Sequence, residues 1–118
     1  MAGESKPVGK DETREFPKGK LEISTVGNTM VGRATFQPGW RWSEHIKPVA
    51  GTDKCEATHL LYCIAGRMKV AHNDGTEAEI GPGDVAVIEP GHDAWILGDE
   101  PFTSVDFGGY ARYGLPKG

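Results

Sequence analysis

The sequence predicts a small, single-domain all-β protein built as a barrel or sandwich of short strands. The chain has 118 residues, which is enough for one hydrophobic core and too few for a barrel with a second domain. Its 17 glycines and 8 prolines form turn signals, and these recur about every 8–12 residues, a spacing typical of barrels and sandwiches. No segment after residue 20 has helical periodicity over three turns.

Short runs rich in β-branched and aromatic residues lie between the turn signals and predict the strands. The predicted strands span residues 21–26, 30–37, 40–46, 58–65, 67–72, 76–80, 84–89, 94–97 and 102–107. Residues 1–20 are interpreted as a polar N-terminal arm, which is flexible or becomes ordered only against the barrel or a second subunit. Residues 21–118 are interpreted as the domain itself.

Composition argues against several classes of partner. The net charge is −4 and no basic patch is evident, so nucleic acid is not expected. No apolar run approaches the roughly 18 residues of a membrane span, and the first residues contain no signal-peptide core. We therefore expect a cytoplasmic protein in which Cys55 and Cys63 are thiols.

A turn–strand–turn–strand pattern begins at Gly83, in the segment GPGDVAVIEPGHDAW. It resembles the second conserved motif of the cupin family, written as a glycine, five residues, a proline, one residue, a glycine, two residues and a histidine. Gly91 matches this motif, whereas Glu89 stands at the position of the family's proline. The family's metal-binding histidine falls on Ala94, two residues after His92.

The first cupin motif is also recognisable. The family writes it as a glycine, five residues, His-X-His, three or four residues, a glutamate, six residues and a glycine. Starting at Gly39, the first family histidine falls on His45 and the second on Lys47. Counting back six residues from Gly66 places His59 where the family has its glutamate. One of the four family ligands is therefore kept unchanged.

The resemblance implies a jelly-roll barrel, also called a double-stranded β-helix, with a pocket at its centre. In such a barrel we expect Leu61, Cys63, Val85 and Val87 to face the interior. Because many small cupins pair and open strand edges are sticky, we also expect a homodimer.

A metal site is the functional implication of the two motifs. If the barrel forms, His45, His59 and His92 converge on one pocket. Neutral imidazoles suit zinc, iron, copper or nickel, and a three-histidine site with an open position is a known catalytic arrangement. The two-residue displacement of His92 keeps the side chain on the same strand face but moves it by about 7 Å. A turn can absorb that shift, or the site can hold only two histidines; a metal-free pocket is the alternative.

Cys55, His59 and Cys63 are spaced by four and would stack on a helix. The sequence THLLYCI instead predicts a strand, on which His59 and Cys63 are separated by about 13 Å, too far to share one ion. Cys63 is better interpreted as a small buried residue facing the same interior as His59, and Cys55 as a loop residue that could swing toward the pocket. His72 lies beside the Asn73–Asp74–Gly75 hairpin turn, where we expect water around it.

Trp40, Trp42 and Trp95 lie close in sequence to the proposed ligands. They could form a wall of a ligand pocket; filling the core or a subunit interface is the simpler interpretation.

Two classes of function follow from the resemblance. The first is a metal-dependent enzyme of the oxygenase or isomerase type that acts on a small organic molecule. The second is a non-catalytic, metal-free cupin that binds or senses a small ligand. The fold alone does not choose between them, and the sequence has no nucleophile elbow, phosphate loop or nucleotide fingerprint.

Overall fold

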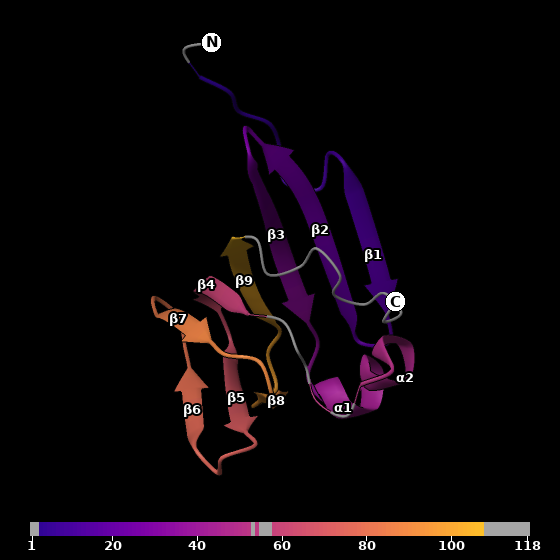
Figure 1. The fold of residues 1–118 in the computed structure, drawn as a ribbon, viewed down its shortest axis with the longest axis vertical. Helices are drawn as coiled ribbons and strands as arrows, with labels where there is room; N and C mark the ends of the chain where they lie inside the picture. The colour runs from indigo at the N-terminus through magenta and orange to yellow at the C-terminus, as the bar shows by residue number, and fades with distance from the viewer. Residues whose placement is uncertain (1–2, 53, 55–57, 108–118) are drawn as a thin grey trace.

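The computed structural model describes residues 3–52, 54 and 58–107, which are folded mainly as antiparallel strands (Figure 1). Two short helices, α1 (Trp42–His45) and α2 (Lys47–Ala50), precede the fourth strand. The strands in the described part of the chain are β1 (Glu12–Phe16), β2 (Gly19–Val26), β3 (Thr29–Phe36), β4 (His59–Ala65), β5 (Arg67–His72), β6 (Glu77–Ile80), β7 (Val85–Ile88), β8 (His92–Leu97) and β9 (Phe102–Phe107).

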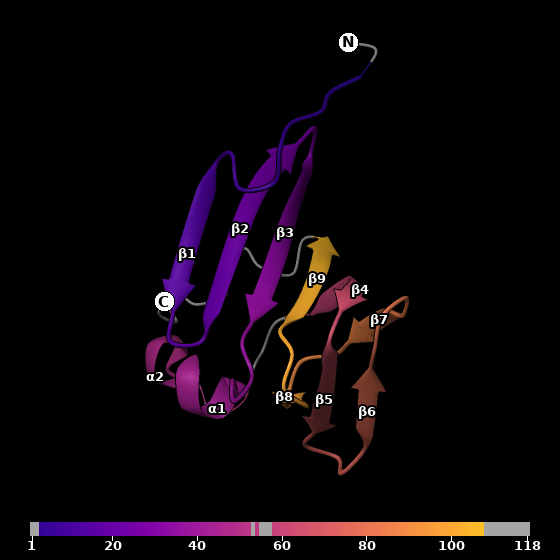
Figure 2. The same cartoon turned by 180° about the vertical axis from the view of Figure 1, so that it is seen from behind.

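The strands form two sheets with the core between them. The larger sheet has the order β1-β2-β3-β9-β4-β7 and the smaller one the order β6-β5-β8. The last strand, β9, lies between β3 and β4, so the larger sheet joins the beginning, middle and end of the chain (Figure 2). This arrangement is consistent with the predicted jelly roll, although the two sheets are not closed into a continuous barrel.

Alternating side chains of the larger sheet fill the core. Leu61 and Cys63 of β4 are 3% and 0% exposed, as the sequence predicts. The prediction for Val85 and Val87 is wrong, because both lie on the outer face of β7 and are 68% and 64% exposed. Every residue of β7 is apolar, so alternation of polar and apolar residues could not indicate which face is buried; the residues that face the core are Ile88 and the partly buried Ala86.

Helix α1 replaces most of the strand predicted at 40–46, and α2 follows it. The backbone pairs with β8 only at a bridge between Arg41 and Trp95 and then turns into α1. The side chain of the N-cap residue Arg41 makes no capping hydrogen bond to α1. Instead, the buried carboxylate of Asp93 accepts hydrogen bonds from the Ser43 N–H at 3.1 Å and from Arg41 Nε at 3.1 Å. The cap therefore comes from a residue 50 positions away, which local sequence patterns do not reveal.

Replacing Asp93 with alanine is expected to lower the free energy of unfolding by about 1–3 kcal/mol, because α1 loses its capping acceptor and Arg41 its ionic partner. Urea denaturation followed by circular dichroism measures the change. Asp99→Ala, on an exposed residue at the end of β8, is the matched control and should change stability by less than about 0.5 kcal/mol. Equal losses in the two variants would contradict the role of Asp93.

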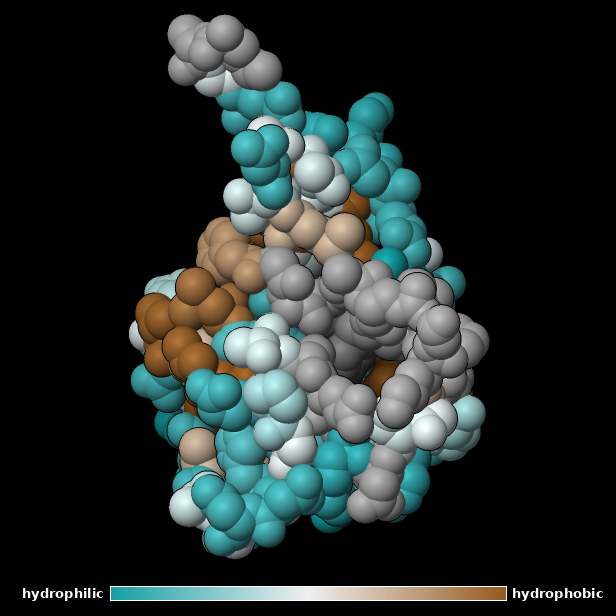
Figure 3. Space-filling view, in the orientation of Figure 1, coloured by the Kyte–Doolittle hydropathy of each residue, from teal (hydrophilic) through white to brown (hydrophobic). Residues whose placement is uncertain are grey.

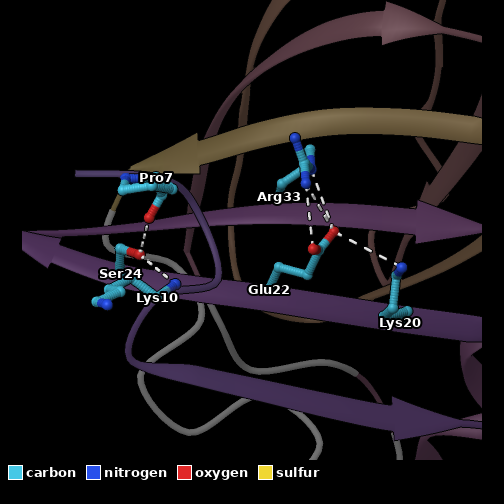
Figure 4. A network of polar contacts seen from close by, with 6 residues as sticks. All are labelled: Pro7, Lys10, Lys20, Glu22, Ser24 and Arg33. Carbon is cyan, nitrogen blue, oxygen red and sulfur yellow. Dashed lines mark hydrogen bonds and ion pairs between the residues drawn. The ribbon is translucent and has the colours of Figure 1, made fainter.

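The N-terminal segment packs against the larger sheet. Residues 12–16 form β1, paired with β2, so the segment expected to be a polar arm contributes a strand. The residues before β1 also contact this sheet: Ser24 Oγ donates to the Pro7 carbonyl at 2.6 Å and accepts from the Lys10 N–H at 3.0 Å (Figure 4). These two hydrogen bonds join residues 7–10 to Ser24 of β2.

Neither of the helices in the described ranges has the length and apolar character needed to cross a membrane.

Candidate functional site

A small pocket lies between the two sheets and is walled mainly by apolar side chains. Its cavity volume is about 20 Å³, room for one water molecule or one metal ion. The residues that line it are Trp40, Trp42, His59, Leu61, Met68, Ile88, His92, Ala94, Phe102 and Ser104. The cavity as it stands is too small for an organic ligand.

His59 begins β4, and its inward position on that strand brings its ring into the pocket. Its Nδ1 lies 2.5 Å from Oδ2 of Asp106 on β9, and both residues are buried. When the Asp106 side chain is a carboxylate it can only accept from the ring, so Nδ1 carries the proton, and in the neutral form of the ring the lone pair is on Nε2. The carboxylate therefore fixes both the tautomer and the orientation of His59.

His92 enters the same pocket from the first position of β8. Its Nδ1–H donates to the backbone carbonyl of Glu89 at 2.7 Å, so its lone pair is also on Nε2. Burial is the main cause that lowers the pKa of His92 to about 4; the hydrogen bond with the Glu89 carbonyl opposes this shift, and the nearby His59 and His72 add to it. The imidazole is therefore neutral at physiological pH, the state that binds metals or accepts a hydrogen bond.

The two pocket histidines are close enough to act together. Their ring centroids are 5.4 Å apart, with an angle of 64° between the ring planes. Two imidazoles that bind one zinc ion, each by a nitrogen about 2.0–2.1 Å from the metal, have centroids roughly 5 Å apart. Ala94, the position of the family's histidine, also lines the pocket, so the two-residue displacement keeps His92 on the pocket side of β8.

The third predicted ligand, His45, is not brought to this pair. It ends α1, where Nδ1 lies 3.0 Å from the Arg41 backbone nitrogen, and it does not line the pocket. Over residues 3–52, 54 and 58–107, no three His, Cys, Asp or Glu side chains form a group that could hold a metal ion. The structure thus brings together His59 and His92 of the three candidates.

Two other residues considered from the sequence lie elsewhere. His72 is partly exposed beside the hairpin turn, with its ring centroid 5.7 Å from that of His92 and its Nε2 3.3 Å from the Glu89 carbonyl. Cys63 faces the interior as a free thiol, and burial is the main cause that raises its pKa. Cys55 lies outside the described residues.

Two buried polar atoms of pocket-lining residues have no hydrogen-bond partner within the described structure. They are Nε1 of Trp40, an obligate donor, and Oγ of Ser104, which can donate or accept. Such buried atoms nearly always have a partner, which is often a water or a ligand. The three tryptophans differ in position. Trp40 and Trp42 belong to the core and also line the pocket. Trp95 is half-buried, and Arg41 stacks on its ring at 4.3 Å.

Sequence reasoning missed Ser104 and Asp106. Both are fully buried on β9, where they alternate with the half-buried Thr103 and Val105. Two polar residues on the inward positions of a predicted strand are unusual, and that pattern in FTSVDF was the available signal.

Comparison with known proteins supports the fold. No sequence profile of a known family matches the chain, and no curated protein matches it. Among solved structures, a cupin-like protein of Thermotoga maritima is 18% identical with a TM-score of 0.51, over 89% of this chain and 77% of the other. A Klebsiella pneumoniae protein with a double-stranded β-helix domain is 21% identical with a TM-score of 0.52, over 86% and 82%.

A variant of Bacillus subtilis oxalate decarboxylase is 22% identical with a TM-score of 0.56, over 85% of this chain and 28% of that longer protein. Likenesses at this level of identity show the fold alone. The chain has the fold of the small cupins, and the resemblance noted in its two motifs is confirmed at that level.

Proposed function

We propose that the pocket binds one divalent transition-metal ion through Nε2 of His59 and Nε2 of His92. The observation that carries the proposal is the pair of Nδ1 contacts, to the Asp106 carboxylate and the Glu89 carbonyl. Metal-binding histidines almost always donate their other ring N–H to such an oxygen, which orients the ring and raises its basicity. A bound ion would supply a Lewis acid or redox centre with open coordination positions.

The chemistry of the donors selects the class of ion. Two imidazoles suit zinc, iron, nickel or copper better than magnesium or calcium, which prefer oxygen ligands. Because His92 is neutral near pH 7, no proton has to be displaced from it before it binds. Trp40 Nε1 and Ser104 Oγ are the groups that can donate hydrogen bonds to an oxygen ligand in the pocket.

An ion with open positions supports an enzyme that acts on a small organic molecule, of the oxygenase or isomerase type. Oxalate decarboxylase, a structural neighbour, is an example of an enzyme with this fold. Since the cavity holds about 20 Å³, a substrate would have to bind at its mouth or widen it. We place this function in the cytoplasm, where a free Cys63 thiol is maintained.

A metal-free pocket is the second candidate, and the hydrogen-bonding inventory favours it. One water molecule could accept from Trp40 Nε1 and Ser104 Oγ and donate to the two imidazole Nε2 atoms, which matches its two acceptor and two donor positions. The cavity has room for one water. In that case the protein would be a non-catalytic cupin that binds or senses a small ligand.

Calorimetric titration of the chelator-treated protein with Zn²⁺ or Ni²⁺ distinguishes the two candidates. We expect one ion to bind per chain near neutral pH. His59→Ala and His92→Ala should each weaken binding by more than the roughly 10–100-fold that loss of an outer hydrogen-bonding partner causes. Asp106→Asn removes such a partner and should weaken binding within that range.

His45→Ala and His72→Ala are the matched controls and should bind as the parent does, because neither residue lines the pocket. Loss of binding in His72→Ala but not in His59→Ala would place the ion at the hairpin instead. No binding by the parent, or equal binding by all variants, would reject the metal site in favour of the metal-free pocket. Circular dichroism of each variant confirms that it is folded.

A further inference from the structure

The pocket contains two hydrogen-bond donors that the histidines do not use. Trp40 Nε1 and Ser104 Oγ are buried, in residues that are 1% and 0% exposed, and neither has a hydrogen-bond partner within the described structure. Ser104 is opposite Cys63 on β4, whereas Asp106, the partner of His59, is opposite Leu61. Residues two apart on a strand are about 7 Å apart, so Ser104 is set back along β9 from the histidine side of the pocket.

The Trp40 donor is fixed in place before any ligand binds. Its ring stacks on that of Phe36, with centroids 3.9 Å apart and ring planes 18° apart, and its backbone carbonyl accepts from the Ile96 N–H at 3.1 Å. An indole N–H can only donate, so its partner must present a lone pair. A donor held rigidly in a buried site stabilises negative charge without the cost of reorganisation.

A divalent ion in this pocket would lack balancing negative charge. Among the described residues that line it, there is no Asp or Glu. Asp106 lies behind His59 and, as a carboxylate, supplies one negative charge, whereas Asp93 is paired with Arg41. The charged residues of β5 and β6 lie on the surface, where Figure 3 shows a largely hydrophilic area at the hairpin end. An uncompensated charge in an apolar cavity is unfavourable, so the site favours an anion as a further ligand of the ion.

The cavity limits this anion to a small one. Its volume of about 20 Å³ suits one water-sized atom, and a divalent ion is smaller than a water molecule. The rest of the lining is mainly apolar and contains no group that would stabilise a second negative charge; it includes Leu61, Met68, Ile88 and Phe102. The anion that fits is therefore singly charged, and either monatomic or rod-shaped so that one end can enter.

We propose that the pocket binds a small monoanion together with the metal ion, and that Trp40 Nε1–H and Ser104 Oγ–H hold this anion. The inference rests on the proposed metal site and adds the class of its ligand, which presents one anionic atom as hydroxide, a halide, cyanate or azide does. Each partner neutralises the other, so the ion and the anion strengthen each other's binding by the same factor.

Sodium azide is the probe that tests the proposal. Azide bound to Cu²⁺ has a charge-transfer absorption band that neither component has alone, so titration of the Cu²⁺-loaded protein reports the anion at the ion. We expect one azide per ion, and calorimetry should show the affinity for Zn²⁺ raised at least about 10-fold by saturating azide. Benzoate at the same ionic strength should not compete with azide, because its ring does not fit the cavity.

Two variants remove the donors separately. Trp40→Phe keeps a ring to stack on Phe36 but has no N–H, and it should lower the affinity for azide about 10- to 100-fold, the effect of losing a hydrogen bond to a charged group. Ser104→Ala should lower it about 10-fold. Trp95→Phe is the matched control: it removes the same N–H from a half-buried residue outside the pocket, and it should bind azide as the parent does.

Zn²⁺ is titrated without azide and then with it, which separates the possible failures. A parent that binds no ion in either case would reject the metal site and the anion with it. An ion that binds with the same affinity in both cases would reject the anion and leave the metal site in place. Equal affinity for azide in all three variants would place the anion away from these donors and overturn the proposal. Circular dichroism checks folding, and Ser104→Ala decides the result if Trp40→Phe does not fold.

Discussion

Replacing Gly66 with alanine is expected to lower the free energy of unfolding by about 3–5 kcal/mol. Gly66 forms the tight connection between β4 and β5 with φ at +79°, a conformation that disfavours any side chain. A Cβ atom there would lie 2.4 Å from the Pro101 carbonyl oxygen and 2.6 Å from Phe102 Cα. Both are backbone atoms, so neither can rotate away, and the β4–β5 connection or the start of β9 would have to move.

Gly75→Ala separates the cost of the positive φ from the cost of the steric contact. Gly75 has a φ of +90°, but a Cβ atom there would meet nothing within 4 Å. This variant should therefore show the backbone strain alone, about 1–2 kcal/mol. Urea denaturation of both variants measures the difference, and equal losses would contradict the steric role of the contact with Pro101 and Phe102.

Acidification is expected to destabilise the chelator-treated protein through His92. The pKa of His92 is lowered from 6.5 to about 4 in the folded state, mainly because the ring is buried. Between these two values the unfolded chain binds a proton that the folded protein does not, so the free energy of unfolding falls as pH falls from 6.5 toward 4. The shift corresponds to at most about 3 kcal/mol, and the loss levels off below pH 4, where both states are protonated.

His92→Asn isolates this effect. The variant keeps a donor near the Glu89 carbonyl but has no group that titrates in this range. Urea denaturation across the same pH range should give a shallower decline than in the parent, by up to the same about 3 kcal/mol. Parallel pH profiles for the two proteins would show that groups other than His92 control acid stability.

The sequence predicted strands well where glycine turns limit them. Strand β5 begins directly after Gly66 and ends at the Asn73–Asp74–Gly75 turn, and it matches the predicted 67–72. Strand β9 likewise matches 102–107. The segment 40–46 could not be predicted in this way, because the acceptor that caps α1 is the distant Asp93.

Only part of the candidate site could be predicted from the sequence, because contacts between distant segments decide which side chains reach the pocket. Family spacing pointed to His59 and His45, but α1 turns His45 away from the pocket that His59 lines. His92 does not match the family position, yet strand alternation keeps it on the same side as Ala94. Asp106 has no motif around it, and its contact with His59 depends on β9 lying beside β4, which is a property of the topology.

Two of the chain's three indole rings, those of Trp40 and Trp42, line the pocket. The intrinsic ultraviolet fluorescence of the protein therefore originates largely at the pocket that contains the proposed metal site. Paramagnetic ions such as Cu²⁺ and Ni²⁺ quench a neighbouring indole, whereas Zn²⁺ does not quench in this way. The protein thus carries its own optical reporter for the pocket, and ions that enter it can be followed and told apart without a label.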